Sequence, residues 1–164
     1  MDRRDIGSWV SGPRAALEAS GIDLGYRGER LGLPEYGIGS VAGFGRRVVA
    51  LFIDWITSAL VATLIFPQWP YGSQESALAT LGVFFVVKSI FTMLGGASFG
   101  QRTMGIRVLP LGRAYTNPPR ALLRTLLICL VVPAVIWDRD GRGLDDKATG
   151  TVVVNTREGR RRPE

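Results

Sequence analysis

The chain has 164 residues, enough for one domain, and carries a formal net charge of +6 with one cysteine and no histidine. The lack of histidine excludes histidine-based triads, metal sites and proton relays, and a single cysteine excludes a disulfide within one chain. Hydrophobic residues make up 46% and gather in three blocks. A sequence pI of about 10.2 suggests nucleic-acid binding, but Lys88 is the only basic residue from 48 to 93, as expected when positive charge collects at the inner face of a membrane.

Residues 1–42 form a glycine-rich segment whose formal charges nearly cancel. Pro13 at a first helical position and Gly21 past the end predict a short helix at 13–20. This piece either lies on the membrane surface or is a loosely ordered tail. Residues 25–39 contain too much glycine and proline for regular structure.

The first apolar block, residues 48–66, is nearly all apolar. With a rise of about 1.5 Å per residue, a helix here crosses most of a ~30 Å hydrocarbon core. Arg46 and Arg47 mark its inner edge and Trp69 belongs to an aromatic belt at its outer edge. We therefore expect a membrane span at about 47–66.

Asp54 interrupts that block. It is seven residues past Arg47, so it lies about 10 Å further in on the same helix face. A carboxylate at that depth costs about 2.5–3.5 kcal/mol on insertion scales. Asp54 therefore requires a partner, a proton or a functional role.

The second block is expected to span at about 77–94 and is interrupted by Lys88. The connection at 67–76 has no lysine or arginine, so it is external, and it is short enough to make the two spans antiparallel neighbours. Lys88 is as far from the inner edge at Gly95 as Asp54 is from Arg47. We predict an intramembrane ion pair between them; the alternative is that Lys88 extends its stem to the interface as an anchor.

Residues 95–124 are rich in arginine, contain no acid, and are expected to be cytoplasmic. The glycine spacing at 95–100 matches a phosphate loop but lacks its lysine and its preceding strand, so we interpret it as a turn. Residues 106–109 predict a strand that pairs with 152–154. That pairing puts both ends of the third apolar block, about 120–137, on one side, which favours a bent, re-entrant or interfacial segment over a full span.

Residues 138–151 resemble a calcium loop at their start, but Arg142 and Thr149 occupy positions where an EF-hand needs ligands. Asp145 and Asp146 are expected to cap a helix or to pair with the arginines of the 95–124 segment. The alternative is a solvated acidic turn. The tail at 156–164 is basic, which predicts a cytoplasmic C-terminus.

Three motifs in order resemble the RDD family of small bacterial membrane proteins: RVVALFID at 47–54, ASFGQRTMGIRVL at 97–109 and RGLDDKATGTVVV at 142–154. The resemblance covers about residues 43–155. The arginine and two aspartates for which the family is named fall on Arg47, Asp54 and Asp146, and Lys88 lies outside its motifs. The resemblance implies a membrane protein of the bacterial inner membrane and suggests transport of an unidentified ligand, including cation/proton exchange.

Together these observations predict an all-α integral membrane protein, with a two-helix transmembrane hairpin, a third bent or re-entrant segment and a small cytoplasmic strand pair. We divide it into a cytoplasmic N-terminal segment (1–42), a membrane domain (43–155) and a basic tail (156–164). The candidate ion-pathway or structural charges are Arg47, Asp54, Lys88, Arg124, Asp145 and Asp146. No cofactor, metal or nucleic acid is expected.

Two functions follow. In the first, the protein is a small transporter or transporter subunit with Asp54 as the ion or proton site and Arg47 and Asp146 as a cytoplasmic gate. Two or three helical segments are too few to enclose a path. The transporter would therefore be a homo-oligomer or would pair with another membrane protein. In the second, it is a non-transporting adaptor whose charge network is structural and whose arginine-rich faces bind anionic lipid or a partner. An enzyme is least favoured, since no nucleophile with a base and no metal cluster is present.

Overall fold

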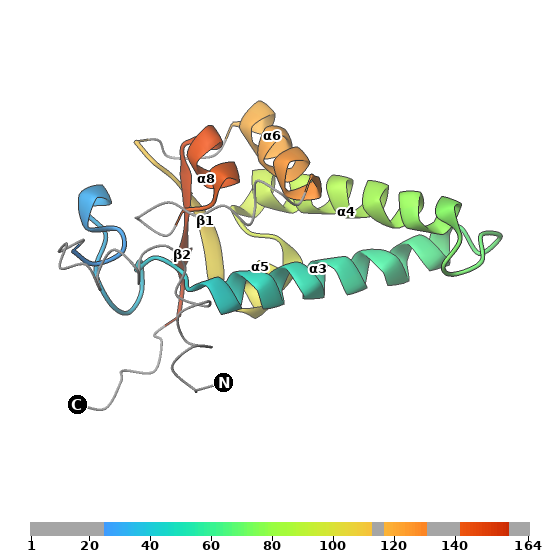
Figure 1. Ribbon diagram of the computed structural model, residues 1–164, viewed down its shortest axis with the longest axis horizontal. Coiled ribbons are helices and arrows are strands. Elements are labelled where there is room, and N and C mark those ends of the chain that lie inside the picture. Colours follow the sequence, from blue (N-terminus) through green and yellow to red (C-terminus); the bar gives the residue numbers. More distant parts are fainter. Residues whose placement is uncertain (1–24, 113–116, 131–141, 158–164) are drawn as a thin grey trace, which may run out of the picture.

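The computed structural model describes residues 25–112, 117–130 and 142–157 of the chain. Two long helices, α3 (Phe44–Ile65) and α4 (Gln74–Gly95), run side by side along the long axis of the molecule (Figure 1). A two-stranded sheet and three short helices gather at the end where α3 begins and α4 stops (Figure 1). The predicted hairpin is therefore confirmed as a pair of long apolar helices.

Both helices begin slightly earlier than the apolar blocks suggested, and the sequence explains where they begin and end. Ser73 caps α4 by accepting a hydrogen bond from the Ser76 amide at 3.2 Å. Gly96 ends α4 in the left-handed region, with φ of 64°, which a glycine adopts without steric cost. Each helix has 22 residues, or about 33 Å by helix rise, so either one is long enough to cross a bilayer.

The surfaces of these helices are apolar and largely uncovered. Only 22% of the most apolar 18-residue window of α3 and 28% of that of α4 is buried inside the molecule. Large side chains such as Leu64, which is 82% exposed, point outward along α3. A core helix of a water-soluble protein buries such a surface, and extended exposed apolar patches mark contact with a membrane or a partner. The two helices therefore indicate a membrane protein.

The sheet pairs β1 (Ile106–Pro110) with β2 (Thr151–Asn155) in antiparallel register, from Ile106 opposite Asn155 to Pro110 opposite Thr151. This confirms the predicted pairing of residues 106–109 with 152–154. The chain just before α3 adds to the free edge of β2, where the Ala42 amide donates to the Val153 carbonyl at 2.9 Å. The buried side chains of Ala42, Ala50, Ile106, Val108 and Val153 form a small core that attaches the sheet to α3.

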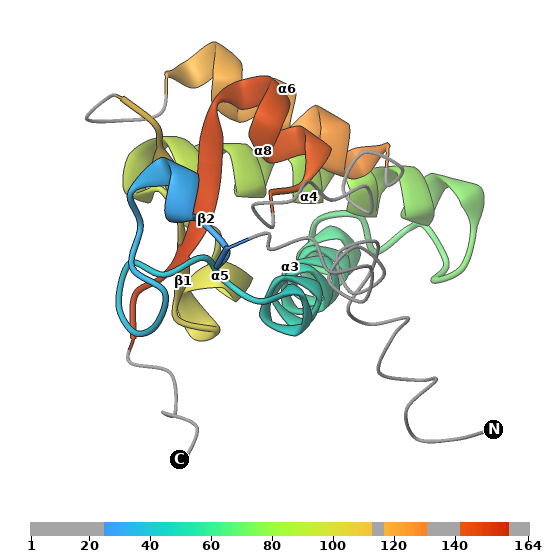
Figure 2. The same ribbon diagram turned by 60° about the vertical axis from the view of Figure 1, so that its left-hand side comes forward.

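Three short helices complete the described structure: α5 (Phe99–Thr103), α6 (Pro118–Cys129) and α8 (Leu144–Thr149). Helix α6 packs along α4, and α8 packs against both α6 and β2 (Figure 2). Because α6 has 12 residues, or about 18 Å, it is too short to span a bilayer.

The structure corrects some of the sequence expectations, and others concern residues that it does not describe. The turn expected at 95–100 leads directly into α5, because Ser98 and Gln101 form a capping box. A single 3-10 turn (Glu29–Leu31) occurs in the segment expected to be irregular. The helix expected at 13–20 and the later part of the third apolar block, from 131, fall outside the described residues.

Helix α5 approaches the backbone of α3 very closely at Gly100. A Cβ atom added to Gly100 would lie 2.1 Å from the Ala50 carbonyl oxygen and 3.0 Å from a carboxylate oxygen of Asp54. Real Cβ atoms do not approach backbone that closely, so only glycine allows α5 to dock here.

We expect Gly100→Ala to destabilise the protein by about 1–3 kcal/mol or more, because α5 must move away from α3. Thermal unfolding in detergent measures this. Gly82→Ala in α4 is the matched control: its Cβ would meet nothing within 4 Å, and alanine favours a helix by about 0.5–1 kcal/mol over glycine. Equal melting temperatures for the two variants would contradict the close contact.

Candidate functional site

Asp54 lies midway along α3 and is surrounded by hydrogen-bond donors of the same chain. Its Oδ2 accepts from Lys88 Nζ of α4 at 2.5 Å and from the Ser98 hydroxyl at 2.6 Å. Its Oδ1 accepts from the Gly100 amide at 2.7 Å. The predicted ion pair is confirmed, and both carboxylate oxygens are engaged.

The pair is buried, with Asp54 5% and Lys88 4% exposed. Lys88 Nζ also lies 5.3 Å from the ring centroid of Phe84, one turn earlier in α4. Because its ammonium group is held inside the molecule, the alternative that Lys88 reaches the interface as an anchor is wrong. Antiparallel helices place the two charges at one depth, as their equal spacing from the inner edge predicted.

A second network lies at the N-terminal end of α3, around Asp146 in the first turn of α8. Asp146 is 0% exposed and its Oδ2 accepts from Arg47 Nη1 at 2.8 Å. Its other oxygen accepts from Arg124 of α6 and from the Thr151 hydroxyl, the latter at 3.2 Å. Arg124 also pairs with Asp145 at 3.2 Å. The prediction that Asp145 and Asp146 pair with arginines is therefore confirmed. The alternative of a solvated acidic turn is wrong.

Arg47 contacts the backbone of other elements in addition to its ion pair with Asp146. Its Nε donates to the Ala42 carbonyl at 3.2 Å and its Nη2 to the Val153 carbonyl at 3.3 Å. One guanidinium group thus connects the membrane helix α3 to β2 and α8. The planar fork of five N–H donors of arginine makes this possible, and lysine cannot reproduce it.

The two adjacent aspartates of α8 experience opposite environments. Burial acts to raise the pKa of Asp146, but Arg124 and then Arg47 outweigh it and hold this pKa below its ordinary value. For Asp145, burial dominates over the attraction of Arg124, and the pKa is raised. Asp146 is therefore the firmly ionised anchor of the network.

The two networks lie close to each other. Lys88 interacts electrostatically with Arg124 and Asp145 as well as with Asp54. Three acids and three bases make up the combined set, so its formal charge is zero. All six residues singled out from the sequence belong to it: Arg47, Asp54, Lys88, Arg124, Asp145 and Asp146.

Sequence reasoning missed the polar partners that complete the set. Ser98, Gly100 and Thr151 contribute one hydroxyl, one amide and another hydroxyl to the aspartates. The signal was present for Ser98, because a serine with glutamine three residues later is the pattern of a capping box. Within the described part of the chain, no group of three or more potential ligands is arranged to hold a metal ion.

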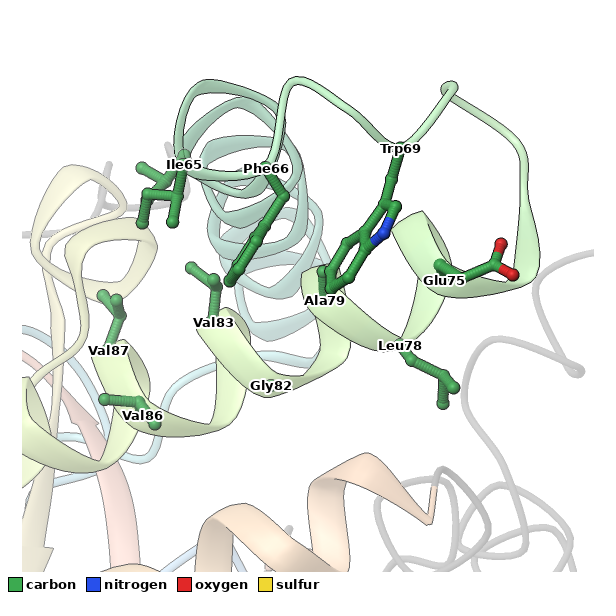
Figure 3. Close-up of a pocket in the computed structure, with 11 residues that line it drawn as sticks. Ile65, Phe66, Trp69, Glu75, Leu78, Ala79, Gly82, Val83, Val86 and Val87 are labelled. Atoms are coloured by element: carbon green, nitrogen blue, oxygen red, sulfur yellow. The ribbon is translucent and has the colours of Figure 1, made fainter.

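The hollow between α3 and α4, next to the connection at 67–76, has a different chemistry. It has a volume of about 610 Å³ and its lining is apolar apart from Glu75. Phe66 and Trp69 stack at 4.6 Å along one side, opposite Val83 and Ala79 of α4 (Figure 3). None of the six charged residues lines this hollow, so it is a surface for apolar groups and not an ion site.

Comparison with known proteins gives one match. The model of the RDD family matches residues 41–150, about two thirds of the chain, and this range includes all six charged residues. No curated protein and no solved structure matches the chain.

Removing one member of the Asp54–Lys88 pair leaves the other charge buried alone. We expect Asp54→Asn and Lys88→Met each to destabilise the protein by about 3–5 kcal/mol, and the double variant to be less destabilised than the sum. Denaturant or thermal unfolding of the four proteins in detergent measures this coupling. Additive effects would show that the two side chains do not interact.

Asp145 and Asp146 are adjacent and chemically identical, so their amide variants are matched to each other. We expect Asp146→Asn to cost about 3–5 kcal/mol, since two arginines lose their shared partner, and Asp145→Asn to cost less. Thermal unfolding in detergent near pH 7 compares them. A greater loss from Asp145→Asn would reverse our assignment of the anchor.

The loss of stability at acidic pH should also reflect Asp146 as the anchor of the network. Because the folded pKa of Asp146 lies below its unfolded value of about 3.9, its stabilisation is present above that pH and is lost as the pH falls below about 4. Asp145 has the opposite sign, since its raised pKa favours the folded state only at low pH. Asp146→Asn should therefore flatten the acid limb of the stability curve.

Proposed function

The chain belongs to the RDD family, and on that premise we propose that it is a non-transporting membrane adaptor. Its two ion-pair networks fold the domain, and it works by associating with copies of itself or with another membrane protein. The observation that carries this proposal is the complete coordination of Asp54. Three donors of its own chain occupy both carboxylate oxygens.

A transport site exchanges its protein contacts for those of the moving ion or proton. At Asp54 such an exchange would leave the Lys88 ammonium, the Ser98 hydroxyl and the Gly100 amide unpaired in a region of low dielectric. Unpaired buried charges and donors are costly. The combined network is also neutral by itself, so it has no need of a bound ion.

Association is supported by what the helices leave uncovered. Most of the apolar surface of α3 and α4 is not buried within the molecule, and the hollow between these helices has room for side chains of a neighbouring protein. Tight packing of apolar and small residues is what joins helices within a membrane. We propose a homo-oligomer or a complex with a partner membrane protein.

The arginine distribution supports an orientation. Arg46, Arg47 and Arg102 lie at the end of the hairpin that meets the sheet, while the 67–76 connection at the other end contains no basic residue. By the positive-inside rule, we propose that the sheet and both termini are cytoplasmic. The family resemblance further suggests a multi-pass protein of the bacterial inner membrane. Cysteine-accessibility labelling of tagged ends in intact cells tests this orientation.

The second candidate is a transporter subunit, and one observation favours it. Lys88 interacts electrostatically with Arg124 and Asp145 as well as with Asp54, so the two networks are coupled. In that role Asp54 would be the site of the ion or proton, and opening of the Arg47–Asp146 pair would be a cytoplasmic gate.

Reconstitution in proteoliposomes separates the two candidates. Vesicles with an internal pH dye receive an outward proton gradient and then Na⁺ or K⁺. The adaptor proposal predicts that wild-type vesicles respond like empty vesicles, and that Asp54→Asn reduces yield and melting temperature. Wild-type flux that Asp54→Asn abolishes in a folded protein would establish transport instead. Glu35→Gln, which removes an exposed acid outside both the networks and the hollow, is the control.

A further inference from the structure

A set of arginines different from those in the ion-pair networks gathers where α5 passes into β1. Arg46 Nη1 donates to the Asn155 side chain at 2.9 Å, and Asn155 lies opposite Ile106 at the start of β1. The stem of Arg157 lies against Gly105, with Cδ 2.9 Å from the position that a Cβ of this glycine would occupy. Arg46 of α3 and Arg157 of the tail therefore lie at the same end of the sheet.

Two further arginines flank the same place along the chain. The carbonyl of Arg102 accepts from the Gly105 amide at 3.1 Å, and Arg107 is an exposed residue of β1. We call Arg46, Arg102, Arg107 and Arg157 the sheet-end arginines.

The sheet-end arginines differ from Arg47 and Arg124 in the partners that they have within the described structure. Among the residues that the structure describes, none of the four forms an ion pair with a carboxylate. Arg46 donates one N–H to Asn155 and Arg102 donates its Nε to the Ala97 carbonyl at 3.3 Å, so each guanidinium group keeps further N–H donors. Guanidinium groups of this kind match the oxygens of a phosphate in pairs.

Their position is at the border of the apolar surface. Arg46 is in the first turn of α3, and the Arg102 guanidinium lies 5.7 Å from the Phe91 ring centroid on α4. Around Arg102, Leu94 is 84% and Phe99 49% exposed: Phe99 lies one turn earlier in α5, and Leu94 precedes Gly95, against which the Arg102 guanidinium lies. Cationic ends above an exposed apolar surface fit a molecule with an anionic head and hydrocarbon chains.

We propose that the sheet-end arginines bind the headgroup phosphate of an anionic phospholipid whose acyl chains lie along Leu94 and Phe99. This inference rests on the membrane placement in the proposed function and is independent of whether the protein transports an ion. The positive charge of these arginines selects an anionic lipid, because a zwitterionic lipid has the same acyl chains but no net negative charge.

The test uses the full chain in a neutral detergent, with the melting temperature followed as phosphatidylglycerol or phosphatidylcholine is added. A ligand that binds the folded state raises the melting temperature with its concentration. We expect phosphatidylglycerol to do so and phosphatidylcholine not to. Arg46→Gln/Arg157→Gln should raise the phosphatidylglycerol concentration required about tenfold or more, and 0.5 M salt should weaken the wild-type response.

Arg27→Gln/Arg30→Gln is the control, since it removes the same charge from exposed arginines at the 3-10 turn. An equal loss in both double variants would overturn the site in favour of general attraction. Stabilisation by inorganic phosphate equal to that by the lipid would show a soluble ligand and overturn it too. If the Arg46/Arg157 double variant fails to fold, native mass spectrometry decides the test by whether the wild-type protein retains phosphatidylglycerol. Failure of this proposal leaves the flux experiment unaffected, because that experiment does not depend on lipid binding.

Discussion

The structure depends on the need to compensate carboxylates that are taken out of water. Asp146 has no exposed surface, and without Arg47 and Arg124 its charge would be costly to bury. These two arginines come from α3 and α6, so the requirement of one carboxylate brings a membrane helix, an amphipathic helix and α8 together. The same rule applies at Asp54, where α3, α4 and α5 meet.

The two networks explain why a domain with so small an apolar core has a defined shape. The contacts among Ala42, Ala50, Ile106, Val108 and Val153 attach the sheet to only one helix. Within lipid, apolar side chains gain little by leaving hydrocarbon for protein, so burial alone does not determine how α3 and α4 are arranged. Hydrogen-bonded charges are directional, and a misplaced partner is costly, so they define both the register of the hairpin and the position of α5.

The same compensation separates two kinds of arginine in this protein. Arg124 is buried, Arg47 keeps only 11% of its side chain exposed, and both arginines have carboxylate partners within the chain. The sheet-end arginines are left without such partners among the described residues, at the edge of the apolar surface. A structural network and an exposed charged surface therefore lie within one short stretch of α3, at Arg47 and Arg46.

The sequence alone determined the hairpin, the strand pairing and the six charged residues. Each follows from a local or periodic signal: apolar length for α3 and α4, β-branched residues for β2, and matching distances from the inner edge for Asp54 and Lys88. Only the tertiary structure decided that Arg124 joins Asp145 and Asp146, that Gly100 contacts Ala50, and that Ser98 shares Asp54 with Lys88. These contacts join residues 20 to 50 positions apart through helix docking, and spacing along one chain carries no information about which faces of separate helices meet.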